Sequence, residues 1–480
     1  MHRRALRGGA SLSGERFSTT KSFAIAVVAV LLTAFLIRGL TAYFIGTHFD
    51  DAGWFPQGIF KLFHEQAVGV LNGTRPAFWI SDVSDPTSAI YPPGYSLWLA
   101  LVYSLGRVDP TSMPLQMLQI VQLVLDSFSV LLVVAIGTKA YSRSVGIFAG
   151  FAAAISPLLA FYGATPLADA PTSWIVLGAV LCLVLACKNE STRWALFAGA
   201  LLGLSCWFRA NGLLLAGVWG VAILVLLRSA WGMRSRLAAS LVFATALVIA
   251  PVLIRNSIAF QAFVPTGLGA GTNLWEGIGE TSRAAEFGAV YGDDQLTERE
   301  RVEQNLGDDP RVTLYWPDGV QRDRERMKKG LSVIASDPVW YAGVMGTRMW
   351  GLLKYAGDVS PIYGSTGINI TSQKCLPESI RFVPLTTLAT IIGWLQSVFR
   401  FIALPLMLIG IFFAIRNHRP LSLIVLTTVG YYLLFGTFLH SEIRYSLPMQ
   451  AVLMVFAGVG MSNIVSLLSR RRSNGGFVGN

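Results

Sequence analysis

Charged residues are scarce in this chain. Of its 480 residues, 14% are Asp, Glu, Lys or Arg, whereas 53% are hydrophobic and the mean hydropathy is +0.55. Soluble domains carry about 25% charged residues. The deficit excludes an ordinary water-soluble protein and indicates that lipid is the main solvent.

Cysteine is also scarce, with four residues in the whole chain. Cys182, Cys187 and Cys206 lie in apolar segments and Cys375 lies in a long polar one, so no disulfide framework is indicated. The sequence contains neither an internal repeat nor a low-complexity tract, and this argues against a transporter built from repeated units.

What the chain has instead is long apolar runs, for example at 23–37 and 237–254. A helix needs about 20 apolar residues to cross the hydrocarbon core of a bilayer. We therefore predict an all-α fold, a polytopic bundle of about ten transmembrane helices. The predicted spans lie near 23–45, 115–137, 145–164, 170–187, 194–208, 211–227, 237–255, 385–415, 420–439 and 445–467.

The formal charge is +11, and basic residues gather in the short loops and at both termini. This is the positive-inside pattern of a membrane protein, so no nucleic-acid partner is expected. It predicts that both termini are cytoplasmic. The predicted parts are a basic N-terminus (1–22), a membrane domain (23–467) and a basic tail (468–480). The first apolar run has no small-residue cleavage site, which favours an uncleaved span over a signal peptide.

Two large extracytoplasmic loops are expected, at about 46–114 and 256–384. In the first, 91–106 is apolar but short and begins with two prolines, which predicts a juxtamembrane or re-entrant helix. In the second, 337–355 is predicted to lie at the membrane surface, with Arg348 and Lys354 at the water edge. The stretch 382–415 is too long for one straight span, which favours one span plus an interfacial helix.

Adjacent carboxylates, Asp50 and Asp51, follow the first predicted span. Two neighbouring carboxylates repel each other, so one of them can act as a base with a raised pKa, or the pair can hold a divalent cation. A solvated helix end would carry the same residues. No cofactor is certain from the sequence; a divalent cation at this pair stays open.

Other polar candidates fall at the same predicted membrane face. Arg209 and Arg255 end two spans, and either guanidinium could bind a lipid phosphate or reach the interface by snorkelling. Asn273, Trp275 and Glu276 offer hydrogen bonds and an apolar ring face, which a sugar site needs. The group is completed by Asp169 at the outer end of the third predicted span and by His440, Glu442 and Arg444 in the short turn before the last span.

One helix also has a polar face inside the membrane. Gln119, Gln122, Asp126 and Ser129 are spaced 3, 4 and 3 residues apart, which places them on one side of a helix. We interpret them as residues that hold helices together, because polar groups in a bundle interior commonly serve that purpose.

The order of these motifs resembles the GT-C superfamily of membrane glycosyltransferases. The matching segments are FDDAGW, YPPGYSLWLALVYSLG, LADAP, FRANGLLL, IRN…GAGTNLWEG and EIRYSLP. They are most similar to bacterial relatives of the dolichyl-phosphate-mannose protein mannosyltransferases and of the aminoarabinose transferase that acts on lipid A. The resemblance extends over about residues 23–465.

The resemblance implies transfer of a hexose or pentose from a polyprenyl-phosphate sugar to an acceptor (glycan, lipid or protein) outside the inner membrane. It implies that Asp50 is the catalytic base, beside Asp51 where the family more often has Glu. In the lipid A branch a Lys contacts phosphate at the position of Tyr91, so this departure makes a lipid A acceptor less expected. The donor-binding candidates are Arg444, Arg255, Arg209, His440, Glu442, Asp169, Asn273, Trp275, Glu276 and Tyr91.

The alternative function is a transporter or flippase of lipid-linked sugars without transferase activity. Alternating access would need charged residues through the depth of the membrane. Here the polar candidates gather at one face of the membrane, and Asp126 is the chief charged residue in the membrane interior. The sequence therefore favours the enzyme.

Overall fold

The computed structural model of the chain describes residues 19–46, 59–74, 91–107, 109, 113–353, 383–440 and 442–475. Within these ranges the protein is helical, and its only extended pairing is an isolated bridge between Thr313 and Trp316. The predicted all-α class is therefore confirmed. Asp50 and Asp51 lie outside the described residues.

Six described helices hold a stretch long and apolar enough to cross a membrane. They are α1 (Thr20–Gly46), α4 (Leu115–Ala140), α7 (Asp169–Asn189), α10 (Trp231–Phe260), α16 (Val383–Phe438) and α17 (Leu447–Gly475). A seventh span arises if α5 (Arg143–Ile155) and α6 (Pro157–Gly163), bent by 63°, cross together. A polytopic bundle is thus confirmed.

The difference from ten predicted spans has a structural reason. Two predicted segments are short helices, α8 (Thr192–Phe208) and α9 (Leu215–Leu226), the latter preceded by the 3-10 turn η3 (Ala210–Gly212). Two others, 385–415 and 420–439, run together in α16, which changes direction at His418 where the backbone leaves helical geometry.

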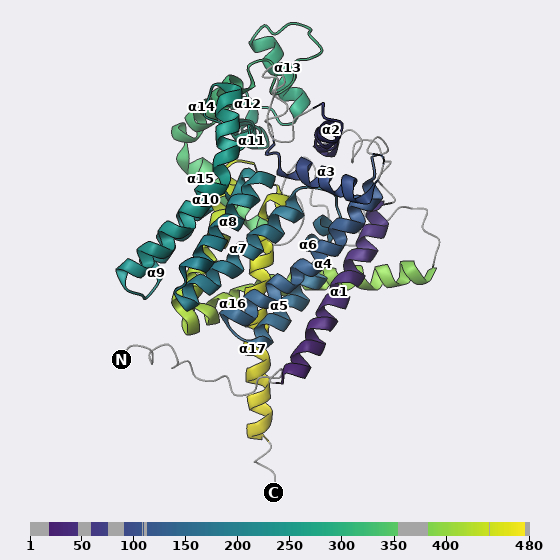
Figure 1. The fold of residues 1–480 in the computed structure, drawn as a ribbon, viewed down its shortest axis with the longest axis vertical. Helices are drawn as coiled ribbons and strands as arrows, with labels where there is room; N and C mark the ends of the chain where they lie inside the picture. The colour runs from purple at the N-terminus through teal and green to yellow at the C-terminus, as the bar shows by residue number, and fades with distance from the viewer. Residues whose placement is uncertain are drawn as a thin grey trace.

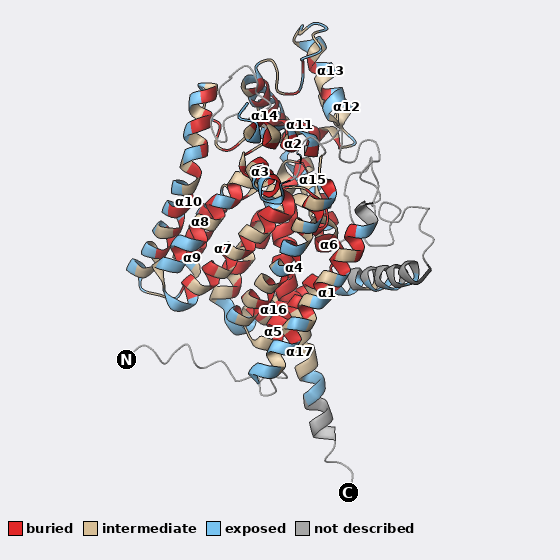
Figure 2. Cartoon of the chain, turned by 45° about the vertical axis from the view of Figure 1, so that its right-hand side comes forward, coloured by how far each residue is buried: buried red, intermediate tan, exposed pale blue. Residues whose placement is uncertain are grey.

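The long helices run side by side, and the first residues of α1 and the last residues of α17 lie at the same end of the bundle (Figure 1). At the opposite end lie α11 (Ala270–Gly279), α12 (Ala284–Phe287), α13 (Asp293–Glu303) and α14 (Gly319–Ser336). We call that end the loop end, and residues 261–353 the loop domain. Buried residues concentrate along the middle of the bundle (Figure 2), while large apolar side chains such as Phe243 and Leu247 remain exposed on its outside, as lipid requires.

Close helix contacts depend on glycine. A Cβ atom added at Gly410 of α16 would lie 1.7 Å from the carbonyl oxygen of Phe456 in α17, and one at Gly146 of α5 would lie 2.6 Å from that of Val134 in α4. Small residues that let backbones approach are the usual means of helix association in a bilayer.

The polar face of α4 binds neighbouring helices, as predicted. Gln119 donates to the carbonyl of Ala164 at 3.0 Å. Asp126 pairs with Arg38 of α1 at 2.5 Å and also accepts from Trp174 of α7. Arg38 is 1% exposed and donates to the carbonyl of Ala154 as well. A buried charge needs such a partner, and no pattern in the sequence pointed to Arg38 as the partner of Asp126.

The loop domain has its own core. It is formed by the buried residues Leu274, Trp275, Ile278, Ala289, Leu296, Leu314 and Tyr341. A buried carboxylate, Glu300 of α13, accepts hydrogen bonds from Arg322 and Arg326 of α14. The loop is therefore a folded unit and not a linker.

The helix α15 (Pro338–Leu353) differs from its prediction at Arg348. This side chain is 5% exposed and donates to the carbonyls of Gly277, Thr437 and Leu439. The prediction that Arg348 lies at the water edge is wrong: a guanidinium has five donors, and here they satisfy carbonyls at the ends of α11 and α16. Arg348 thereby joins the loop domain to the bundle.

Two short helices precede the bundle's second long helix. α2 (Ile59–Leu71) packs against α3 (Gly94–Gly106) through buried Phe63 and Tyr95, whose ring centroids are 5.0 Å apart. The 13 residues of α3 measure about 20 Å along the helix axis, which is too short to cross the hydrocarbon core.

Candidate functional site

The candidate site lies at the loop end, where α7 begins and α8 ends. Arg209 follows the last turn of α8, and its Nη2 donates to Oδ2 of Asp169, in the first turn of α7, at 2.9 Å. Both side chains are almost fully buried. A carboxylate in a first turn is stabilised by the positive end of the helix dipole, and the ion pair ties the two helix ends together.

Aromatic rings flank the Arg209 guanidinium. Its Cζ lies 5.7 Å from the ring centroid of Tyr91 and 5.6 Å from that of Tyr445. Arg444 lies 5.3 Å from the same Tyr445 ring. Because the face of an aromatic ring attracts a cation, Tyr445 holds two guanidiniums at one place despite their mutual repulsion.

A chain of alternating charges continues from Arg444 into the loop domain. Nη2 of Arg444 donates to Oε1 of Glu442 at 2.8 Å, and Nε2 of His440 lies 3.4 Å from the same oxygen. Nδ1 of His440 lies 3.2 Å from Oε1 of Glu280, which in turn lies near Arg348. We call Arg444, Glu442, His440, Glu280 and Arg348 the charge chain.

The two carboxylates of the charge chain set the charge of His440. Burial alone would lower the pKa of His440, but the close carboxylates of Glu280 and Glu442 outweigh burial and raise it to about 10. Both ring nitrogens then carry protons at neutral pH. His440 is therefore a cation beside Arg444, which suits anion binding and not a general base.

Glu276 of α11 behaves differently from its neighbours. Burial, followed by the nearby charge of Asp293, raises the pKa of Glu276 to about 8. A carboxyl group held neutral near pH 7 can donate a hydrogen bond. Asn273 of the same helix lines a small cavity of about 30 Å³ with Asn211, His440 and Tyr445 among its walls, which is room for one or two waters.

Trp275 lies elsewhere. It is 5% exposed, packs in the core of the loop domain and lies 5.8 Å from Nζ of Lys329. Residues two apart on a helix face different sides, so Asn273 faces the bundle whereas Trp275 faces the loop core. The sugar-binding role of Trp275 stays a prediction.

Three candidates from the sequence remain. Arg255 is buried in the last turns of α10, and its role stays a prediction. Asp50 and Asp51 fall outside the described residues. Within the residues that the structure describes, no three His, Cys, Asp or Glu side chains form a group that could hold a metal ion.

Sequence reasoning missed two members of the charge chain. Glu280 directly follows α11 and lies four residues after Glu276, so both side chains fall on the same side of this helix. This spacing could have indicated Glu280 from the sequence. Arg348 lay in a stretch whose aromatic content pointed to the membrane surface. Only the fold brings it to the ends of α11 and α16.

The described residues thus form an all-α polytopic membrane bundle with buried arginines at one end, beside a helical loop domain. Comparisons with known proteins add what this arrangement is similar to. Residues 91–255 match the model of the dolichyl-phosphate-mannose-protein mannosyltransferase family. No curated protein matches the sequence.

Solved structures extend the likeness over nearly the whole chain. The apo oligosaccharyltransferase of Archaeoglobus fulgidus is 13% identical, with a TM-score of 0.55, over 97% of this chain and 53% of that one. The oligosaccharyltransferase AglB of the same organism, in complex with an inhibitory peptide and a dolichol-phosphate, is 12% identical, with a TM-score of 0.51, over 95% and 52%. This chain thus spans about half the length of those proteins. Together these matches confirm the resemblance to the GT-C superfamily.

Proposed function

We propose that this protein is a membrane glycosyltransferase that moves a sugar from a polyprenyl-phosphate donor to an acceptor on the extracytoplasmic face. The observation that carries the proposal is the meeting of Arg209, Arg444 and protonated His440 at the loop end. Three cations at the end of an apolar bundle suit a phosphate whose lipid tail remains in the bilayer. The solved dolichol-phosphate complex supports a lipid-linked donor.

The reaction would be a single displacement. The acceptor hydroxyl oxygen forms a bond to the anomeric carbon as the bond from that carbon to the phosphate oxygen breaks. The phosphate leaves with the bonding electrons and gains charge, which Arg444, Arg209 and His440 stabilise. Asp50 takes the proton of the acceptor hydroxyl. Inversion at the anomeric carbon is the expected outcome.

The contacts of Arg209 and Arg444 indicate different roles for the two side chains. Arg209 is fixed by Asp169 and lies between two rings, so it holds a permanent position. Arg444 shares Glu442 with His440, and a phosphate can displace that carboxylate from part of its hydrogen-bonding surface. We therefore assign the closest phosphate contact to Arg444.

The rival function, a flippase of lipid-linked sugars, would use charges at depth. The deep pair Arg38 and Asp126 is closed by further hydrogen bonds to Ala154 and Trp174. A pair whose hydrogen bonds are satisfied in this way suits helix packing rather than alternating access.

The experiment that separates the two functions incubates purified protein with labelled polyprenyl-phosphate sugars of several kinds. Release of free polyprenyl phosphate with transfer of the label supports the enzyme; labelled lipid that crosses liposomes unchanged supports the flippase.

A further inference from the structure

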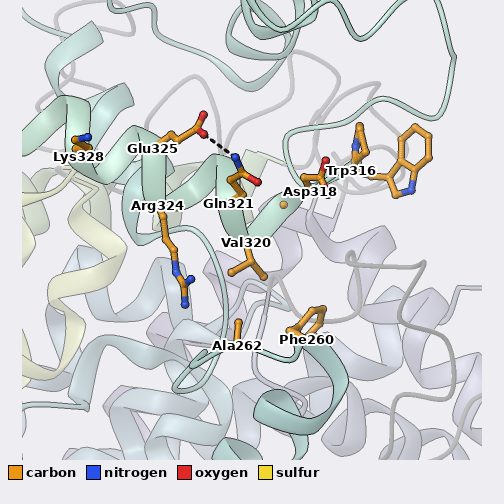
Figure 3. A pocket seen from close by; sticks show the side chains of 11 residues that line it. Phe260, Ala262, Trp316, Asp318, Val320, Gln321, Arg324, Glu325 and Lys328 are labelled. Carbon is orange, nitrogen blue, oxygen red and sulfur yellow. Dashed lines mark hydrogen bonds between the residues drawn. The ribbon is translucent and has the colours of Figure 1, made fainter.

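A second cavity lies beside the candidate donor site, on the outer side of α14. It measures about 720 Å³, within the range of about 300–1,000 Å³ typical of small-molecule sites. Figure 3 shows Arg324 and Val320 of α14 directed toward Phe260 at the end of α10. The cavity is lined by Phe260, Ala262, Trp316, Pro317, Asp318, Gly319, Val320, Gln321, Arg324, Glu325 and Lys328.

The lining combines aromatic rings with planar polar groups. Trp316 and Phe260 are only half-buried, and Arg311 covers Trp316 at 4.7 Å, which fixes the indole while part of its surface stays open. Gln321 donates to Glu325 at 3.0 Å. Amide, carboxylate and guanidinium groups can each bind pairs of neighbouring hydroxyls, and an aromatic ring can pack on the apolar face of a sugar.

The charges of the lining favour a neutral ligand. Asp318 and Glu325 are formally balanced by Arg324 and Lys328. Neither cation forms an ion pair with another residue of the described ranges, so both retain donors for a ligand. The carboxylates Asp318 and Glu325 also form no ion pair within the described ranges, unlike Asp169 and Glu442 of the donor site. They would therefore repel a phosphate or an anionic lipid headgroup, whereas uncharged hydroxyl groups can hydrogen-bond to any of these side chains.

One turn connects this cavity to the donor site. Trp316 lines the cavity, and the preceding residue, Tyr315, lies close enough to Tyr91 for an electrostatic interaction between their hydroxyl groups. The Tyr315 hydroxyl also approaches within 3.0 Å of where a Cβ on Gly269 would lie. The turn is held by Arg322, which donates to the carbonyls of Thr313 and Trp316. A molecule in the cavity would thus lie next to the donor-binding residues.

We infer that this cavity binds a neutral saccharide and so selects a carbohydrate acceptor. The inference rests on the proposed function, which supplies a sugar donor on the other side of the same turn. Trp316 would pack on a sugar ring, while Gln321 and Arg324 would bind its hydroxyls. The acceptor hydroxyl to be glycosylated would extend past Tyr315 toward the donor.

The test is a binding measurement on the full chain in lipid nanodiscs. Fluorescently labelled neutral trisaccharides of mannose, glucose, galactose or N-acetylglucosamine are titrated, and anisotropy is recorded. We expect saturable binding of at least one of them. Trp316→Ala and Gln321→Ala should each weaken it about tenfold. The matched control is Trp350→Ala, because Trp350 is an exposed tryptophan of α15 outside the cavity.

Each outcome is decisive. Absence of saturable binding for every trisaccharide, or equal binding by wild type and well-folded Trp316→Ala and Gln321→Ala proteins, would overturn the inference. So would loss of binding on replacing zwitterionic by anionic lipid in the nanodisc, because a headgroup would then occupy the cavity. Arg444→Ala should leave trisaccharide binding unchanged. Binding that depends on Trp316 without any sugar transfer would reject the proposed enzyme and retain the saccharide site.

Discussion

At the scale of single residues, the site depends on how cations share carboxylates. Arg209 has Asp169 for itself, whereas Arg444 and His440 share Glu442. The contact of Arg209 with the ring of Tyr445 brings these pairs together across more than 200 positions of the chain, so no sequence pattern could reveal it. The sequence did indicate which residue types matter at this face, because His, Glu and Arg within five positions are unusual in a short turn between spans.

Arg444 is the first residue to test. Arg444→Ala should weaken donor binding or turnover at least about tenfold, because a charge-assisted hydrogen bond contributes about 1.5–3 kcal/mol. Arg444→Lys should recover part of the activity, since charge is kept and the planar fork is lost. Kinetics with a lipid-linked sugar donor measure both. Arg299→Ala, on the exposed α13, should change nothing; an unchanged Arg444→Ala enzyme would move the phosphate site elsewhere.

His440 predicts a pH dependence. Its pKa is raised from 6.5 to about 10, so the stabilisation by its ion pairs is fully present below about pH 6.5 and is lost as the pH rises through about 10. Glu280→Gln removes one of the carboxylates that raise this pKa. Donor affinity and thermal stability should then begin to fall at a lower pH than in the wild type.

The control for that pH profile is Glu298→Gln. Glu298 is a largely exposed carboxylate of α13 with no place in the charge chain, so its profile should match the wild type. If donor affinity and thermal stability fall at the same alkaline pH in the wild type and in Glu280→Gln, Glu280 does not hold His440 in its cationic form.

At the scale of elements, helix positions followed from apolar runs, but helix breaks did not. Each predicted span is helical for most of its length, yet the break between α5 and α6 and the bend at His418 were not foreseen. Helix ends are fixed by contacts with neighbours, which hydropathy does not encode. The same reason explains Arg348: an arginine beside aromatics is typical of an interface, and only packing turns it inward.

The contact of α16 with α17 predicts a matched pair of variants. Gly410→Ala should lower the apparent melting temperature, because its Cβ would meet the Phe456 carbonyl and overpacking costs about 1–3 kcal/mol. Gly430→Ala lies in the same helix, and its Cβ would meet nothing within 4 Å. It should have little effect. Similar melting temperatures for both variants would contradict this helix contact.

At the scale of the whole molecule, charge sorting predicted which segments share a side. The start of α1 and the end of α17 lie at one end of the bundle, and α11–α14 lie at the other (Figure 1). The sequence did not predict that the loop would build its own core around Glu300, because that core needs α13 and α14 to pack. It also did not predict the cavity beside α14, whose walls come from the end of α10, from α14 and from the residues just before α14.

Topology gives a direct prediction. A single cysteine introduced within 292–304, on the loop domain, should react with an impermeant thiol reagent in intact cells. One introduced within 229–236 should react only after permeabilisation, because the basic loops are expected inside. A version without the four native cysteines is the background. Labelling of both positions from the same side would contradict the orientation.

Sugar transfer that depends on Asp50 is the central claim, and one assay tests it most directly. Purified wild type, Asp50→Asn and Asp51→Asn proteins are given a labelled polyprenyl-phosphate sugar, and donor binding and transfer are measured on the same samples. Asp50→Asn keeps the size of the side chain but cannot accept a proton. It should bind donor normally while transfer falls about a hundredfold or more.

The neighbour separates two mechanisms in that same assay. Asp51→Asn should be milder if Asp50 acts alone as a base; an equal loss, reproduced by a chelator, would indicate that the pair holds a divalent cation. The account predicts transfer by the wild type and its loss in Asp50→Asn with donor binding retained. Near-normal transfer by well-folded Asp50→Asn protein would contradict it.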